Sequence, residues 1–173
     1  MTLGEVLSSS DEYLARKGVD SPRLDAELIL AHAFGMSRLE LYTSFDRPLT
    51  EAELAIARPL VERRGRREPL AYILGEWGFR GLTLRTDARA LVPRPETEIV
   101  VERALAAIQG LETPRVVDVG TGTGAIALAI ADEHPGAALT ATDVSPDALS
   151  LARENAERLG LEIEPSRRAC STA

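Results

Sequence analysis

The sequence predicts an α + α/β fold, in which a small N-terminal helical bundle is followed by a β-hairpin and then by alternating strands and helices. Helix start signals recur through residues 1–74, whereas strand and helix patterns alternate from residue 115 onward. Between these parts, residues 76–84 alternate apolar and polar side chains about two glycines, which favours a β-hairpin over a helix. We therefore expect three parts: a helical domain at 1–74, a hairpin connector at 75–92 and an α/β domain at 93–173.

Four helix starts can be located in the helical part. Three pairs have the Ser/Thr-x-x-Glu spacing of a capping box, in which each side chain satisfies a free backbone N–H group at a helix start: Thr2 with Glu5, Ser37 with Glu40, and Thr50 with Glu53. In the fourth start, Ser21 precedes Pro22, and proline suits the first position of a helix. Apolar residues then recur at helical spacing, as in Leu24, Leu28, Ala31 and Phe34. These signals predict four short helices that form a bundle.

Composition and charge limit the classes of protein to consider. The chain has 173 residues, 45% of them hydrophobic, and a formal net charge of −7, which argues against nucleic acid as its main partner. A local basic cluster is expected to face water at the end of a helix: Arg63, Arg64, Arg66 and Arg67. The single cysteine, Cys170, excludes an internal disulfide and offers no metal site. Because no apolar run approaches the ~18 residues of a membrane span and no leader segment is recognisable, we expect a cytoplasmic protein without a membrane partner.

The most informative segment of the α/β part is a glycine turn between a strand and a helix. An apolar, β-branched strand at 115–119 runs into three alternate glycines, Gly120, Gly122 and Gly124, and an alanine-rich helix follows at 125–133. Glycines at such a bend let the backbone approach a ligand closely, and the N–H groups at a helix N-terminus attract negative or densely polar groups. We therefore expect bare backbone N–H groups to face a ligand here.

A carboxylate is expected beside this turn. A second strand at 138–142 is followed by Asp143, after which Ser145 and Pro146 begin a helix that runs to about residue 158. Parallel strands need a crossover helix, and this crossover is right-handed, so the glycine turn and Asp143 should share one edge of the sheet. There a carboxylate can accept hydrogen bonds from both hydroxyls of a ribose. The predicted nucleoside-cofactor site contains Asp118, Gly120, Thr121, Gly122, Thr123, Gly124 and Asp143.

The glycine pattern alone leaves two cofactors open. Gly120, Gly122 and Ala125 also satisfy the G-x-G-x-x-G/A fingerprint of dinucleotide-binding enzymes, with an acid at about the expected distance. A nicotinamide-dependent oxidoreductase is therefore one interpretation. Three features favour S-adenosylmethionine instead: Asp118 stands two residues before the first glycine, a third glycine occupies position 124 rather than the helix-packing position, and a helical domain precedes the site.

Several strings of the sequence form a recognisable series in their order and spacing. They are Arg67–Gly75, Trp77–Phe79, Leu91–Glu98, Asp118–Ala129, Ala141–Asp143, Ser145–Leu149 and Ala152–Ala156. With these strings the chain resembles, over about residues 1–163, the N5-glutamine methyltransferases that modify peptide chain release factors. Many methyltransferases share the glycine loop, whereas the Pro-Arg-Pro-Glu-Thr-Glu string at 93–98 is typical of this family.

The resemblance implies that residues 93–173 form the first part of a Rossmann-like class I methyltransferase domain that depends on S-adenosylmethionine, and that residues 1–74 bind the substrate. In such enzymes the loop at Gly120–Gly124 holds the cofactor, and the acid at Asp143 holds its ribose hydroxyls. The implied reaction transfers a methyl group to the side-chain amide nitrogen of the glutamine in a Gly-Gly-Gln loop of a release factor. An Asn-Pro-Pro-Tyr motif of the family accepts both amide hydrogens and thereby aims the nitrogen at the methyl group.

The sequence departs from the family pattern in its last part. It contains no Asn-Pro-Pro-Tyr, and its single asparagine, Asn155, lies in a predicted helix, so we assign no catalytic residue and no metal ligand. Residues 162–164 could begin a third strand, but residues 165–173 have no strand pattern, so the third strand is expected to be missing. We therefore expect a truncated or frame-shifted product that lacks the family's activity. A non-catalytic fragment that only binds a release factor is the second interpretation, and an NAD-dependent oxidoreductase is the third.

Overall fold

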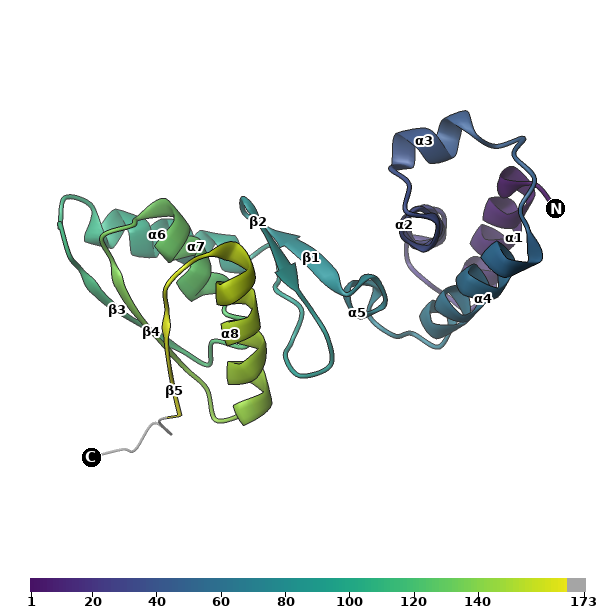
Figure 1. Ribbon diagram of the computed structural model, residues 1–173. Coiled ribbons are helices and arrows are strands. Elements are labelled where there is room, and N and C mark those ends of the chain that lie inside the picture. Colours follow the sequence, from purple (N-terminus) through teal and green to yellow (C-terminus); the bar gives the residue numbers. More distant parts are fainter. Residues whose placement is uncertain (168–173) are drawn as a thin grey trace. The chain divides into compact units, whose positions relative to one another are not determined.

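The computed structural model describes residues 1–167, and Cys170 lies outside this part of the chain. Contacts divide the chain into two compact units, residues 1–74 and 75–173, whose elements are labelled in Figure 1. The first unit contains the helices α1 (Leu3–Arg16), α2 (Pro22–Phe34), α3 (Arg38–Thr43), α4 (Glu51–Gly65) and α5 (Leu70–Leu74). The second unit contains β1 (Glu76–Phe79), β2 (Leu82–Arg85), α6 (Thr97–Ile108), β3 (Arg115–Val119), α7 (Ala125–Glu133), β4 (Ala138–Thr142), α8 (Pro146–Leu159) and β5 (Glu164–Ser166). Within the described residues, none of the helices combines the length and apolarity needed to cross a membrane.

The helices of the first unit begin at the residues that the sequence predicts. In each capping box the Ser or Thr side chain accepts a hydrogen bond from the backbone N–H of the Glu, and the Glu side chain accepts one in return: Thr2 with Glu5, Ser37 with Glu40, and Thr50 with Glu53. At α2, Ser21 is the N-cap residue and Pro22 lies in the first turn, but the Ser21 side chain makes no capping hydrogen bond. The four predicted helices are thus confirmed, and the short helix α5 follows them.

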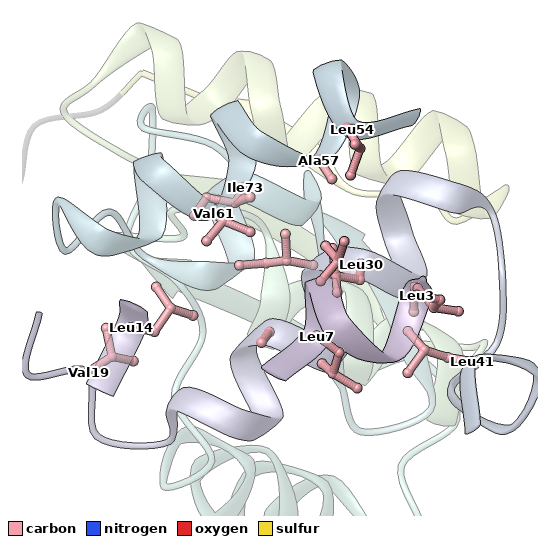
Figure 2. Close-up of a cluster of buried hydrophobic side chains, with 14 residues drawn as sticks. Leu3, Leu7, Leu14, Val19, Leu30, Leu41, Leu54, Ala57, Val61 and Ile73 are labelled. Atoms are coloured by element: carbon pink, nitrogen blue, oxygen red, sulfur yellow. The ribbon is translucent and has the colours of Figure 1, made fainter. Parts of the chain in front are cut away.

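A cluster of aliphatic side chains forms the core of the first unit, and Figure 2 shows that α1, α2 and α4 all contribute to it. The apolar spacing that begins at Leu24 predicts the buried side of α2 only in part. Leu24 is 41% exposed, whereas Ala26, Ile29 and Leu30 are fully buried. Because α2 carries apolar residues around most of its circumference, spacing alone does not indicate which side packs against α1 and α4.

The basic cluster at the end of α4 is largely ion-paired. Arg63 pairs with Glu68 at 2.5 Å, and Arg64 pairs with Asp25 of α2 at 2.6 Å. The side chains of Arg64 and Asp25 are only 16% and 9% exposed. The expectation that this cluster faces water is therefore wrong for Arg64, because a carboxylate on α2 draws that guanidinium into the unit.

The predicted hairpin is confirmed, since β1 and β2 pair antiparallel with Phe79 opposite Leu82. Both of these side chains are buried in the main apolar cluster of the second unit. Arg80, in the turn, donates its backbone N–H to Glu98 of α6 at 3.0 Å, and its guanidinium pairs with Glu133 of α7. The hairpin is therefore packed and hydrogen-bonded within the second unit.

Besides the hairpin, the second unit has a parallel sheet, with its described strands in the order β3-β4-β5 (Figure 1). The bounds of β3, α7 and β4 are those that the sequence predicts. The expectation that a third strand is missing is wrong, because β5 pairs with β4 from Thr140 opposite Glu164 to Thr142 opposite Ser166. Proline has no N–H group to donate to a neighbouring strand, so Pro165 argues against a strand in the sequence pattern. Pairing with β4 nevertheless holds residues 164–166 in an extended form.

Candidate functional site

The glycine loop and the acid predicted beside it follow neighbouring strands. Val119 at the end of β3 lies opposite Thr142 at the end of β4 in the parallel register. The backbone N–H groups of Gly120 and Thr121 both donate to the carbonyl oxygen of Thr142, at 2.8 and 2.9 Å. The loop that leaves β3 is therefore joined to the last residue of β4, and Asp143 comes next along the chain.

The conformation of the loop explains its alternate glycines. Gly120, Gly122 and Gly124 have φ angles of 77°, 56° and 84°, in the left-handed region that residues with a Cβ rarely adopt. Gly124 is also closely approached, since a Cβ there would lie 3.0 Å from Leu128 Cδ1 and 3.2 Å from Ala152 Cβ. Helices α7 and α8 thus pack closely on Gly124, which corrects the expectation that this glycine does not lie at a helix-packing position.

The loop amides are engaged within the protein, which corrects the expectation that they are bare. In addition to the two bonds to Thr142, Gly124 N donates to Thr121 O at 2.9 Å. Gly122 N donates to Asp143 Oδ2 at 3.0 Å. These bonds hold the loop in one shape.

The Asp143 side chain connects the loop to the start of α8. Its Oδ2 atom accepts from Gly122 N at 3.0 Å, and its Oδ1 atom accepts from Ser145 N at 2.9 Å. A carboxylate oxygen has two lone pairs, so each oxygen of Asp143 keeps one acceptor position. The side chain is half-buried. Asp143 therefore offers two oriented acceptors at the loop.

Asp118 lies beneath the loop, with 7% of its surface exposed. Thr121 Oγ1 donates to its Oδ2 atom at 2.6 Å, and the backbone N–H of Ala127 in the first turn of α7 also donates to the carboxylate. The N-cap residue of α7 is Gly124, which has no side chain, so Asp118 supplies the acceptor that an N-cap side chain would supply. Burial raises the pKa of Asp118, and the two hydrogen bonds act in the opposite direction.

The structure adds one residue that the sequence patterns did not identify as part of this site. Asn155 of α8 is fully buried, and its Nδ2 atom donates to Thr123 O at 2.9 Å. Thr123 itself is 2% exposed. Helical spacing could have indicated its burial, because Asn155 lies four residues after Leu151 and three after Ala152, on the buried face of α8.

The loop and Asp143 bring exposed backbone and free acceptor positions together. Gly120 is exposed, and a Cβ placed on it would meet no atom within 4 Å, so the loop backbone borders open space there. Asp143 presents acceptors for two hydroxyl groups from the neighbouring strand end. Asp118, Thr121 and Thr123 lie inside the protein and hold the loop.

Comparison with known proteins identifies the class of protein to which such a unit belongs. Residues 96–170 match the family model of the methyltransferase small domain, so the second unit is part of a methyltransferase domain. Residues 5–75 match the model of the PrmC N-terminal domain. A release factor glutamine methyltransferase of Deinococcus radiodurans is 46% identical over 164 residues, and one of Chlorobaculum tepidum is 44% identical over 162 residues. Over nearly all of its described sequence, the chain is thus similar to release factor glutamine methyltransferases, and the two domain models match it one after the other.

The chain is shorter than these relatives. The two matches cover 95% and 91% of this chain, but 59% and 55% of the relatives from Deinococcus radiodurans and Chlorobaculum tepidum. The chain thus spans little more than half the length of the curated relatives it matches. Among solved structures, it is similar to the N-terminal domain of human METTL16, with 21% identity and a TM-score of 0.45, over 73% of this chain and 57% of that chain.

Proposed function

We propose that this chain binds S-adenosylmethionine at the loop from Gly120 to Gly124, with Asp143 accepting hydrogen bonds from the ribose hydroxyls. The observation that carries the proposal is the double attachment of Asp143 to Gly122 N and Ser145 N. These bonds fix the direction of the carboxylate and leave one acceptor position on each oxygen. A ligand with two adjacent hydroxyls then binds without having to order the side chain, which lowers the entropic cost of binding.

The other predicted site residues have positioning roles in this proposal. Asp118 holds Thr121 through a hydrogen bond of 2.6 Å and caps α7, so it keeps the loop in its curved form. Gly120 borders the ligand, because its backbone faces open space. When bound, S-adenosylmethionine supplies a methyl group activated by a positively charged sulfur. The chain's own residues bind and orient it.

The substrate proposal comes from the relatives. They are named release factor glutamine methyltransferases, so we propose that the first unit, residues 1–74, binds a peptide chain release factor. The glutamine amide nitrogen is a weak nucleophile, because its lone pair is delocalised into the carbonyl group. The Asn-Pro-Pro-Tyr motif that the family resemblance provides for this amide does not occur in the 173 residues.

Asn155 does not substitute for that motif. It is fully buried, and its Oδ1 atom already accepts from Arg85 N at 2.7 Å. A substrate amide therefore cannot reach it in this conformation. We propose that these 173 residues bind the cofactor but do not transfer its methyl group.

Calorimetric titrations of the purified chain test the proposal. We expect saturable binding of S-adenosylhomocysteine with one site per chain, and no binding of NAD. Binding of NAD without binding of S-adenosylhomocysteine would instead favour the oxidoreductase. A second assay measures transfer of a labelled methyl group from S-adenosylmethionine to a release factor. Stoichiometric transfer would contradict the proposal that this chain only binds the cofactor. If the chain binds the release factor but not the cofactor, it is a non-catalytic substrate-binding fragment.

A further inference from the structure

We propose that Asn155 is a positioning residue that holds the glycine loop of the cofactor site against α8 and β2. The proposal rests on the function proposed above, because it concerns the same loop. It goes beyond that function in assigning a role to the single asparagine of the chain, which lies outside the loop and outside the strand ends.

Three hydrogen bonds define the role. Asn155 Nδ2 donates to Thr123 O at 2.9 Å and to Arg85 O at 3.1 Å, and Arg85 N donates to Asn155 Oδ1 at 2.7 Å. A side-chain amide has two N–H donors and an oxygen with two lone pairs, so these bonds use both donors and one acceptor position. Asn155 therefore joins the loop to the last residue of β2 in a defined geometry.

Burial makes these bonds consequential. Asn155 has no exposed surface and lies on the face of α8 that also buries Leu151 and Ala152. A buried amide is unfavourable unless it is hydrogen-bonded, whereas a leucine has the same branched shape, with larger methyl groups, and no such requirement. The property that distinguishes asparagine from leucine at this position is its ability to bond both Thr123 and Arg85.

The loop needs such an attachment because its glycines allow many backbone conformations. Three consecutive loop residues are each held by a side chain from a different element. Thr121 is held by Asp118 of β3, Gly122 by Asp143 after β4, and Thr123 by Asn155 of α8. The side chain of Asn155 also bonds Arg85 of the hairpin, so it joins the loop directly to β2.

Two variants separate the hydrogen bonds from the packing. Asn155→Leu keeps the branched shape and removes all three bonds, but its methyl groups need more room than the amide does. Asn155→Asp keeps the shape and the acceptor for Arg85 N, but directs its other carboxylate oxygen at the carbonyls of Thr123 and Arg85. Leu151→Ala is the matched control, because it destabilises α8 by removing a buried apolar side chain that makes no hydrogen bond to the loop.

Hydrogen exchange of the loop amides in the ligand-free full chain gives a readout that does not depend on cofactor binding. We expect the protected amides of Gly122 and Gly124 to exchange about tenfold faster in both Asn155 variants, as for loss of one hydrogen bond to a buried group. Leu151→Ala should be compared with the Asn155 variants under conditions that give them the same free energy of unfolding. In Leu151→Ala, we expect the ratio of the loop exchange rate to the exchange rate of the rest of the second unit to stay unchanged. Unchanged loop exchange in Asn155→Leu would overturn the proposal.

The affinity for S-adenosylhomocysteine provides the second readout. We expect the Kd to rise about tenfold in the Asn155 variants, since the loop must then be ordered by the ligand. If the unaltered chain binds no S-adenosylhomocysteine while the loop exchange still responds to Asn155, the proposed function fails and the positioning role stands. If the unaltered chain binds and neither readout responds, the positioning role fails and the function stands.

Discussion

The backbone N–H of Gly122 donates a hydrogen bond to Oδ2 of Asp143 over 3.0 Å. The same carboxylate accepts from Ser145 N through its other oxygen. The acid that we propose to bind the ribose is thus also the group that ties the glycine loop to the start of α8. A change at Asp143 should therefore alter both the shape of the loop and its contact with the ligand.

We predict that Asp143→Asn raises the Kd for S-adenosylhomocysteine by at least about tenfold. The amide has one acceptor oxygen in place of two, so one charge-assisted hydrogen bond, of about 1.5–3 kcal/mol, is lost. Asp147→Asn serves as the control, because Asp147 is an exposed carboxylate in the first turn of α8. Calorimetric titration measures the affinity of both variants for S-adenosylhomocysteine. Equal affinities in the two would show that Asp143 does not bind this molecule.

Gly124→Ala should destabilise the second unit more than Gly160→Ala does. Both glycines have positive φ angles, 84° and 66°, so an alanine at either position costs about 1–2 kcal/mol in backbone strain. A Cβ at Gly160 meets nothing within 4 Å, whereas at Gly124 it comes within 3.0 Å of Leu128 Cδ1. We expect this overpacking to add about 1–3 kcal/mol, measured by urea unfolding. Equal losses of stability would mean that α7 and α8 yield freely at the loop.

Features set by neighbouring residues could be predicted from the sequence. Thr50 and Glu53 form their capping box because both lie in one helical turn. The change from an apolar run to alternate glycines marks the end of β3. The ends of adjacent parallel strands share one edge, which is why Asp143 was expected beside the loop and is found there.

Features set by distant residues could not be predicted in the same way. The amides of Gly120 and Thr121 donate to a carbonyl on the neighbouring strand, and the glycine pattern does not specify this. In the sequence, Arg64 cannot be distinguished from the other arginines of its cluster, because its partner Asp25 lies 39 positions away. Asn155 reads as an ordinary polar residue of a helix, because its partner Arg85 lies 70 positions away. Tertiary contacts decide all three cases.

Arg64 and Arg66 provide a test of the buried ion pair in the first unit. We predict that Arg64→Ala lowers the free energy of unfolding by about 2–3 kcal/mol, because it leaves the largely buried Asp25 carboxylate without its partner. Arg66→Ala should cost less than about 0.5 kcal/mol, since Arg66 and its partner Glu62 are 77% and 59% exposed. Circular dichroism during urea unfolding measures both. Similar losses in the two variants would indicate that Arg64 is solvated after all.

Glu53 makes the stability of α4 depend on pH. The backbone N–H of Thr50, then the Arg47 guanidinium and the Thr50 hydroxyl, lower the pKa of Glu53 from 4.5 to about 2. Because the pKa is lowered on folding, this stabilisation is complete above pH 4.5 and is lost as the pH falls towards 2. In Glu53→Gln, the free energy of unfolding should therefore fall less steeply than in the unaltered chain as the pH is lowered from 4.5 to 2.

The urea midpoint of unfolding, measured at several pH values between 2 and 6, gives the comparison for Glu53. Glu51→Gln removes another carboxylate from the first turn of α4 and is the control. A pH profile of Glu53→Gln that parallels the unaltered chain would contradict the capping role.

A crystal structure of the chain with S-adenosylhomocysteine tests the proposed site most directly. We predict that the ribose hydroxyls lie within hydrogen-bonding distance of Oδ1 and Oδ2 of Asp143, and that the adenosine borders the exposed backbone at Gly120. An adenosine bound at any other place on the chain, or one whose ribose makes no contact with Asp143, would contradict the assignment of this loop as the cofactor site.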